Sequence, residues 1–254
     1  MLNNNNNNNT TTTTTTTLKM NNNGQTKADN QQAKLFAKFC KKGDLEKMKE
    51  IIKNKNVGIH VYNEAFRFAC EKGHLKVAQW LLETNPNIDI FQYNEISFLS
   101  ACEKGHLEVV KWLYAKKQED IYRDHVYDPI CNYNKDPSFC ELCEDPSSYN
   151  YNNAFGFACK NGNLKVAQWL FEQKPDIYKL TLGENEFSFR WACRNGHLKV
   201  AQWLFELKPD IDISVENYEA YVFACNNGHH KVVKWLKSVF PSLANLKMVE
   251  SVNF

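Results

Sequence analysis

The stretch "FACEKGHLKVAQWLL", Phe68–Leu82, recurs in close copies along the chain, and this repetition determines the fold that we expect. The copies are SACEKGHLEVVKWLY (Ser100–Tyr114), FACKNGNLKVAQWLF (Phe157–Phe171), WACRNGHLKVAQWLF (Trp191–Phe205) and FACNNGHHKVVKWLK (Phe223–Lys237). Six glycines mark the units at intervals of 30, 32, 57, 34 and 32 residues: Gly43, Gly73, Gly105, Gly162, Gly196 and Gly228. A period of ~33 residues is typical of proteins built from stacked repeats.

Each unit predicts two short helices joined by a tight turn. Ala65, Phe66 and Ala69 fall on one face of a first helix, and Gly73 ends that helix because glycine readily adopts a left-handed backbone conformation. Leu75–Leu82 then carry the apolar side of a second helix, and a polar stretch with a proline follows. Neither helix is long enough to be stable alone, so stacking must bury the apolar faces. The sequence therefore predicts an all-α fold, an α-solenoid of stacked helix-turn-helix units.

These units resemble the ankyrin consensus, in which Ala-Ala-x-x-Gly-His-Leu-Glu-Val-Val precedes a run of leucines. The resemblance covers residues 33–240. The sequence of the units is also similar to the divergent ankyrin arrays of amoebae and of amoeba-infecting giant viruses. The resemblance implies a non-catalytic scaffold that binds another protein through the concave face lined by its first helices. The family's Thr-Pro-Leu-His is replaced by "EAFR" at Glu64–Arg67, so the resemblance predicts stacked helices and leaves the family's β-hairpins open.

Composition divides the chain into segments around this array. Residues 1–32 are rich in asparagine and threonine and cannot bury enough apolar surface to fold, so we expect a disordered tail. Residues 33–240 form the array of about six units, and its first and last units carry polar residues in apolar columns, as caps do. A cysteine-containing insert near 123–152 interrupts the array, and residues 241–254 form a C-terminal tail.

Most units place a cysteine four residues before a histidine, as in Cys70 and His74, which raises the question of a metal site. The cysteine is kept in all six units, whereas the histidine is replaced by Asp44 and Asn163 in two of them, so the two positions do not vary as a ligand pair would. Histidine, asparagine and aspartate share a side-chain acceptor. We therefore expect them to cap the second helices, with the cysteine as a small core residue.

The insert contains the cysteines that lie outside this core column, together with a histidine: His125, Cys131, Cys140 and Cys143. Cys140-x-x-Cys143 has a spacing found in zinc sites, and four such ligands would complete a tetrahedral centre that orders the insert. Three interpretations stay open: an acidic loop with idle thiols, a zinc site that forms a second binding element, and a redox role. No other cofactor is expected.

Three columns of the first helix change in chemistry from unit to unit, those of Glu64, Arg67 and Glu71. They recur at i, i+3 and i+7, so they lie on one stripe that faces away from the apolar side. We expect this stripe to bind a partner protein, and neutral variation at exposed positions is the alternative. The candidate contacts are Arg67, Glu71, Leu99, Glu103, Phe187, Arg190 and Arg194.

The remaining composition excludes several classes of function. A net charge of +2 gives no electrostatic reason to expect a nucleic acid or an anionic membrane as partner. No apolar run approaches the ~18 residues that a membrane helix needs. No phosphate-binding loop or nucleophile elbow is present, so we expect no enzyme. No secretory signal is visible, which predicts an intracellular protein with reduced cysteines, cytoplasmic in the simplest case and with the nucleus open.

The sequence thus predicts a monomeric scaffold whose partner is an unidentified protein. A substrate adaptor for a ubiquitin ligase is the alternative that the resemblance implies. Such an adaptor would need a further ligase-binding module, and we expect room for one neither in residues 1–32 nor after Phe240.

Overall fold

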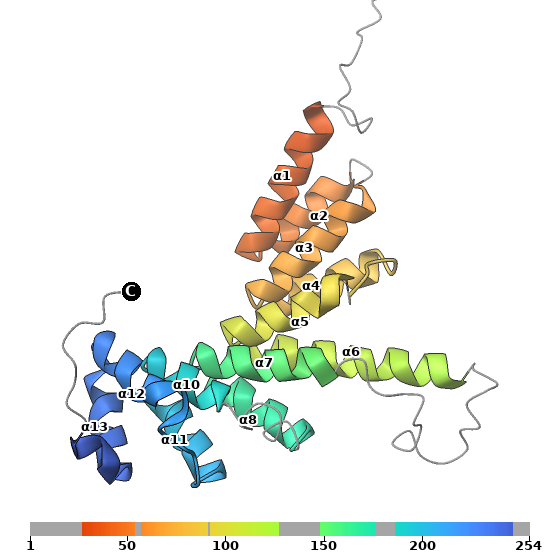
Figure 1. Ribbon diagram of the computed structural model, residues 1–254. Coiled ribbons are helices and arrows are strands. Elements are labelled where there is room, and N and C mark those ends of the chain that lie inside the picture. Colours follow the sequence, from red (N-terminus) through yellow and green to blue (C-terminus); the bar gives the residue numbers. More distant parts are fainter. Residues whose placement is uncertain (1–26, 54–56, 91, 127–147, 176–185, 246–254) are drawn as a thin grey trace, which may run out of the picture.

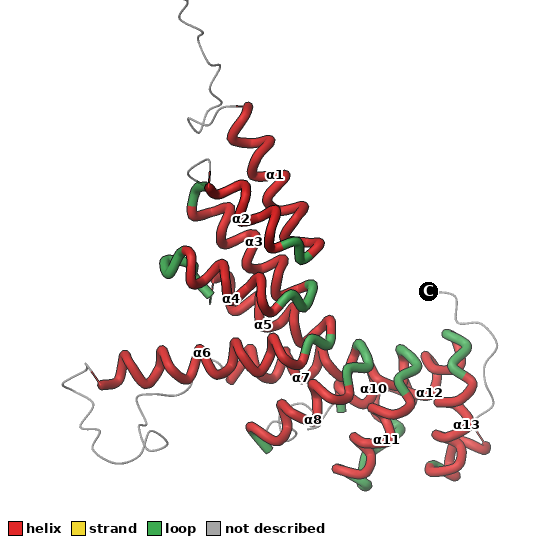
Figure 2. Tube along the Cα trace, turned by 180° about the vertical axis from the view of Figure 1, so that it is seen from behind, coloured by secondary structure: helices red, strands yellow, loops and turns green. Residues whose placement is uncertain are grey.

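The computed structural model describes residues 27–53, 57–90, 92–126, 148–175 and 186–245. Within these residues all regular structure is helical, which confirms the expected all-α fold (Figures 1 and 2). The elements are α1 (Lys27–Lys42), α2 (Leu45–Lys53), α3 (Ile59–Glu71), α4 (Leu75–Thr84), α5 (Gln92–Lys104), α6 (Leu107–Val126), α7 (Ser148–Lys160), α8 (Leu164–Gln173), α10 (Phe187–Arg194), α11 (Leu198–Leu207), α12 (Val215–Asn226), α13 (His230–Val239) and the 3-10 helix η3 (Pro241–Asn245).

The described helices stack as six pairs, each made of a first and a second helix (Figure 1). The first helices are α1, α3, α5, α7, α10 and α12, and the second helices are α2, α4, α6, α8, α11 and α13. Consecutive first helices contact one another along the whole stack, whereas the second helices pack mainly on their own first helices. The stack therefore bends toward the first helices, which line the inner side of the curve (Figure 1).

The turn inside each pair depends on its glycine in two ways. At Gly73 the backbone φ is +75°, a left-handed conformation that side chains other than glycine's adopt at a cost. A Cβ atom on Gly73 would also lie 2.4 Å from Nδ1 of His106, which belongs to the turn of the next pair. Glycine is therefore required both by the local backbone and by the close packing of successive turns.

The residue that follows the glycine fastens its pair to the preceding pair. Nε2 of His106 donates to the carbonyl oxygen of Glu71 at 3.0 Å, and Nδ2 of Asn163 donates to that of Glu103 at 2.7 Å. These carbonyls end a first helix and have no partner within it. The expected capping role is wrong for Asn163 and for three histidines, His74, His197 and His229, which make no side-chain cap bond. It is right for Asp44, whose carboxylate accepts a backbone N–H of α2.

The core consists of the small and aromatic columns of the first helices together with the aliphatic columns of the second. Ala69 and Cys70 are fully buried, and Phe66 is nearly so. Burial raises the pKa of the Cys40 thiol to about 12, which keeps the thiol protonated and unreactive. Cys225 in the last pair is only half-buried. The cysteines of the stack are therefore core residues, as the sequence predicts.

The tryptophans of the second helices are half-buried and join one pair to the next. The ring of Trp203 lies 6.1 Å from that of Phe155 and 5.9 Å from that of Phe171, both in the preceding pair. Trp235 repeats both kinds of contact one unit further along. The indoles therefore contribute to the contact between units while keeping part of their surface in solvent.

The ends of the array differ from the boundaries expected from the sequence. Helix α1 begins at Lys27, inside the segment that we expected to be disordered, and residues 1–26 of that segment lie outside the described residues. At the other end, the segment expected as a C-terminal tail begins with η3, and Leu243 is buried against the core. The helical array is therefore longer at both ends than the range 33–240 over which the sequence repeats.

The expected insert is partly helical. Helix α6 continues to Val126 and has 20 residues, whereas α8 has 10, so α6 projects well beyond the neighbouring pairs (Figure 1). Residues 127–147 lie outside the described residues. None of the described helices, α6 included, combines the length and the apolar character needed to cross a bilayer.

The connections that follow the second helices are anchored by alternating isoleucines. Ile88 and Ile90 are buried after α4, and Ile211 and Ile213 are buried after α11. The described parts of these two connections, residues 85–90 and 208–214, contain no strand. The family's β-hairpins, which the sequence left open, are therefore absent from these two connections.

Candidate partner-binding face

The first helices turn one band of side chains to the inner side of the curve, at the positions equivalent to Glu64, Arg67, Phe68 and Glu71. We call this band the inner face. The predicted contact residues all occupy it, on α3, α5 and α10. Among the described residues at these four positions only Gly156 is buried, and the others keep part of their surface in solvent.

On α3 the two predicted contact residues, Arg67 and Glu71, interact with each other and with adjacent side chains. Nη1 of Arg67 lies 3.4 Å from the Glu71 carboxylate, and the guanidinium lies 4.3 Å from the ring of Phe68. Glu71 also bonds Lys72 at 3.0 Å, and this bond is the main reason why the pKa of Glu71 lies below its usual value. The carboxylate therefore stays charged at neutral pH and faces the inner side as part of a short charge chain.

A groove runs between α3 and α5 on the inner face. It has a volume of about 540 Å³ and is lined by Ile59, His60, Asn63, Glu64, Arg67, Asp89, Ile96 and Ser97. The side chains of Ile59 and Ile96 stay 43% and 37% exposed at its edges. The two candidates on α5 do not line this groove: Leu99 is half-buried against the core, and Glu103 pairs with Lys104 at 3.0 Å.

On α10 the predicted contacts fall into two groups. Phe187 is 45% exposed with its ring 5.6 Å from that of Trp191, and Arg194 covers the same indole at 4.8 Å. The side chain of Arg190, by contrast, is only 14% exposed and lies 3.0 Å from Glu219 of α12. Arg190 therefore ties two units together and is poorly placed to meet a partner, whereas Phe187 and Arg194 are accessible.

The sequence prediction overlooked a column of aromatic side chains on the inner face. It consists of Phe68, Phe157, Trp191 and Phe223, all of which are half-buried. Lys41 lies 3.8 Å above the ring of Phe68, so cations alternate with rings here too. The signal was visible in the sequence, because an aromatic residue begins most copies of the repeated stretch.

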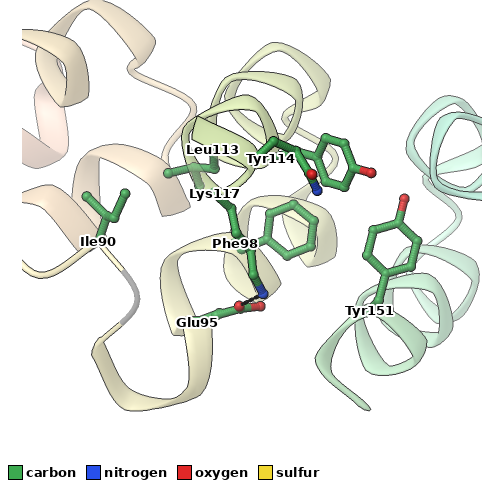
Figure 3. A pocket seen from close by; sticks show the side chains of 8 residues that line it. Ile90, Glu95, Phe98, Leu113, Tyr114, Lys117 and Tyr151 are labelled. Atoms are coloured by element: carbon green, nitrogen blue, oxygen red, sulfur yellow. Dashed lines mark hydrogen bonds and ion pairs between the residues drawn. The ribbon is translucent and has the colours of Figure 1, made fainter. Parts of the chain in front are cut away.

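Two buried ion pairs were also missed. Lys208 at the end of α11 lies 3.0 Å from the Glu186 carboxylate, which is only 3% exposed, and Lys117 pairs with Glu95 at the equivalent place (Figure 3). The carboxylate of Glu186 also accepts the backbone N–H of Asp212, which fixes the connection after α11. The signal in the sequence is a glutamate and a lysine at the same spacing in two units.

The second of these pairs borders a small cavity between α5, α6 and α7 (Figure 3). The cavity measures about 20 Å³, which is roughly the space of one water molecule. Its lining is Ile90, Glu95, Phe98, Leu113, Tyr114, Lys117, Gln118 and Tyr151. It is therefore too small for an organic ligand, and the inner face is the candidate site.

The predicted zinc ligands are not placed by the structure. Cys131, Cys140 and Cys143 lie outside the described residues, and for His125 only the backbone of α6 is described. Among the side chains that the structure does describe, no group of three or more His, Cys, Asp or Glu residues could hold a metal ion. A zinc site in the insert, and with it a second binding element, stays a prediction.

The histidines that join the pairs make stability depend on pH. Burial is the main cause that lowers the pKa of both His106 and His197, and electrostatic interactions with His74 and Lys72 lower that of His106 further. Below pH ~6.5 the unfolded chain therefore binds protons that the folded chain resists, and the free energy of unfolding should decrease. We expect the melting temperature to fall between about pH 7 and pH 5.5, before most carboxylates titrate.

One unit of the chain has an asparagine in place of this histidine and suggests the control for the pH dependence. Asn163 occupies the same column and donates to two carbonyl oxygens without titrating. The double variant His106→Asn, His197→Asn should therefore stay folded and lose part of the slope of melting temperature against pH. An unchanged slope in that variant would show that these two histidines do not cause it.

Comparisons with known proteins agree with this architecture. A family model described as "Ankyrin repeats (3 copies)" matches residues 35–124 and 155–245, and one described as "Ankyrin repeats (many copies)" matches residues 98–171. Among solved structures, "Crystal structure of human ASB11 ankyrin repeat domain" aligns with a TM-score of 0.50 at 14% identity, covering 81% of this chain and 83% of that chain. At this identity the likeness concerns the fold alone. No curated protein sequence matches the chain.

Proposed function

This chain belongs to the ankyrin repeat family, and on that basis we propose that it is a non-catalytic, monomeric scaffold whose inner face binds a partner protein. Ankyrin repeats typically serve as protein–protein interaction modules. A stack of this kind offers one continuous surface over several units rather than a single cleft. Assignment to the divergent amoebal or viral type stays a prediction from the sequence of its repeats.

One observation carries the proposal. The four large apolar side chains that are exposed within the described residues all lie on first helices: Leu35, Ile59, Ile96 and Phe187. Ile96 and Phe187 occupy the inner face, and Ile59 borders the groove between α3 and α5 together with Ile96. Apolar side chains gathered on a concave surface and surrounded by charges are typical of a protein-binding face.

The test is a double variant of the groove, Ile59→Asp with Ile96→Asp. We expect the Kd for a partner captured from host cells to rise at least about tenfold, because both changes place a charge where the partner must exclude water. The melting temperature should change little, since both side chains are exposed in the free chain.

The matched control is Lys76→Ala with Lys165→Ala. Both lysines are exposed on second helices, away from the inner face, and the control changes the net charge by the same amount as the groove variant. Equal affinities of wild type, groove variant and control would reject the inner face as the binding surface.

A further inference from the structure

The inner face over α7, α10 and α12 carries a cluster of rings and cations, which we call the aromatic–cation cluster: Lys160, Phe187, Trp191, Arg194 and Phe223. Nζ of Lys160 lies 4.3 Å from the centre of the Trp191 ring, and the guanidinium of Arg194 lies 3.9 Å from that of Phe223. The exposed ring of Phe187 packs against Trp191 at 5.6 Å. The five side chains therefore form one continuous platform across three units.

The platform carries more positive than negative charge. Lys160 forms no ion pair with any described residue, so its ammonium is balanced only by the face of the indole. Arg190 and Arg194 share one carboxylate, that of Glu219, at 3.0 and 3.5 Å. The other carboxylate nearby, Glu216, lies 3.9 Å from Arg190 and is 61% exposed. A carboxylate arriving from outside would therefore find Lys160 unpaired and Arg194 only partly neutralised.

The rings strengthen this attraction. A cation held against an aromatic face is partly removed from water, and a charge pair formed there is screened less than one on an open surface. Phe187 and Trp191 also offer apolar area beside the cations, so a ligand that combines acidic and apolar side chains matches both features.

We propose that the aromatic–cation cluster binds an acidic peptide segment of the partner, with an apolar side chain against Phe187 and Trp191 and carboxylates beside Lys160 and Arg194. The proposal rests on the proposed function, because it names the chemistry that one end of the inner face selects. A nucleic acid also combines negative charge with stacking bases, but among the described residues the local excess is one cation, and the chain's net charge is only +2.

The groove between α3 and α5 differs in charge from the cluster. The carboxylates of Glu64 and Asp89 and one guanidinium, that of Arg67, line it beside Ile59 and Ile96. Carboxylates of a partner are therefore favoured at the cluster over the groove.

The test uses the purified full chain and a display library of random peptides. We expect the selected peptides to combine aspartate or glutamate with an apolar residue. Anisotropy titrations with one synthetic selected peptide should then show a Kd at least about tenfold higher for Lys160→Glu, and weaker binding at higher salt. Arg194→Gln and Phe187→Ala should weaken the same peptide independently.

The control is Lys165→Glu, which makes the same charge change on the outer side of α8 and should leave the Kd unchanged. Selection of basic or uncharged peptides, failure to select any peptide, an unchanged Kd for Lys160→Glu at unchanged melting temperature, or tighter binding of a mixed-sequence single-stranded oligonucleotide would each overturn the proposal. If the groove variant still loses its partner in that case, the proposed function stands without it.

Discussion

Replacing Gly73 by alanine should destabilise the array by about 2–4 kcal/mol, because it combines a left-handed backbone with overpacking. The residue has a φ of +75°, and its new Cβ would lie 2.4 Å from the ring of His106. The ring cannot move away without breaking its bond to the carbonyl of Glu71. Urea unfolding of the full chain, followed by circular dichroism, measures the loss.

The same substitution at Gly228 separates the two causes. Gly228 has a φ of +71°, but a Cβ atom there would meet nothing within 4 Å. Gly228→Ala should therefore show only the backbone cost, about 1–2 kcal/mol. If both variants lose the same stability, the close approach of His106 contributes nothing and our account of the turn is wrong.

Replacing Phe155 by alanine should cost about 3–5 kcal/mol, because the side chain is fully buried in the middle of the stack. Its ring also contacts Trp203 of the next pair at 6.1 Å, so the cavity weakens the contact between units. In a stack held by neighbour contacts, we expect the parts on either side to unfold in separable transitions. Calorimetry and the fluorescence of the tryptophans would both detect a second transition.

Phe187→Ala is the matched comparison for this loss. It removes the same ring from a first helix, but Phe187 is 45% exposed, so the change in stability should stay within about 0.5 kcal/mol. The pair of variants therefore distinguishes a phenylalanine that holds units together from one that is free to contact a partner. Similar losses for both would contradict the assignment of Phe187 to the inner face.

The core could be predicted from the sequence because every unit repeats the same environment. A residue type kept in all six copies, such as the cysteine of Cys70, or in five of them, such as the alanine of Ala69, reports burial when the copies stack. The position of the variable columns could also be predicted. The i, i+3, i+7 spacing of Glu64, Arg67 and Glu71 is enough to put them on one side of a helix.

Contacts between units could not be predicted in the same way. The sequence shows that histidine and asparagine share a hydrogen-bonding side chain, but not that the nearest partner is a carbonyl of the preceding unit. The same limit applies to Arg190, which appears as one variable surface residue until Glu219 of the next unit is placed beside it. The Glu186–Lys208 pair joins residues 22 positions apart, beyond the range of helical spacing.

Helix α6 projects from the side of the array (Figure 1). Its 20 residues extend roughly 30 Å, about twice the length of the other second helices, and it points away from the inner face (Figure 1). A fluorophore or an affinity label attached at its distal end would lie away from the concave side. Such a label should therefore leave the proposed binding face on the inner side accessible.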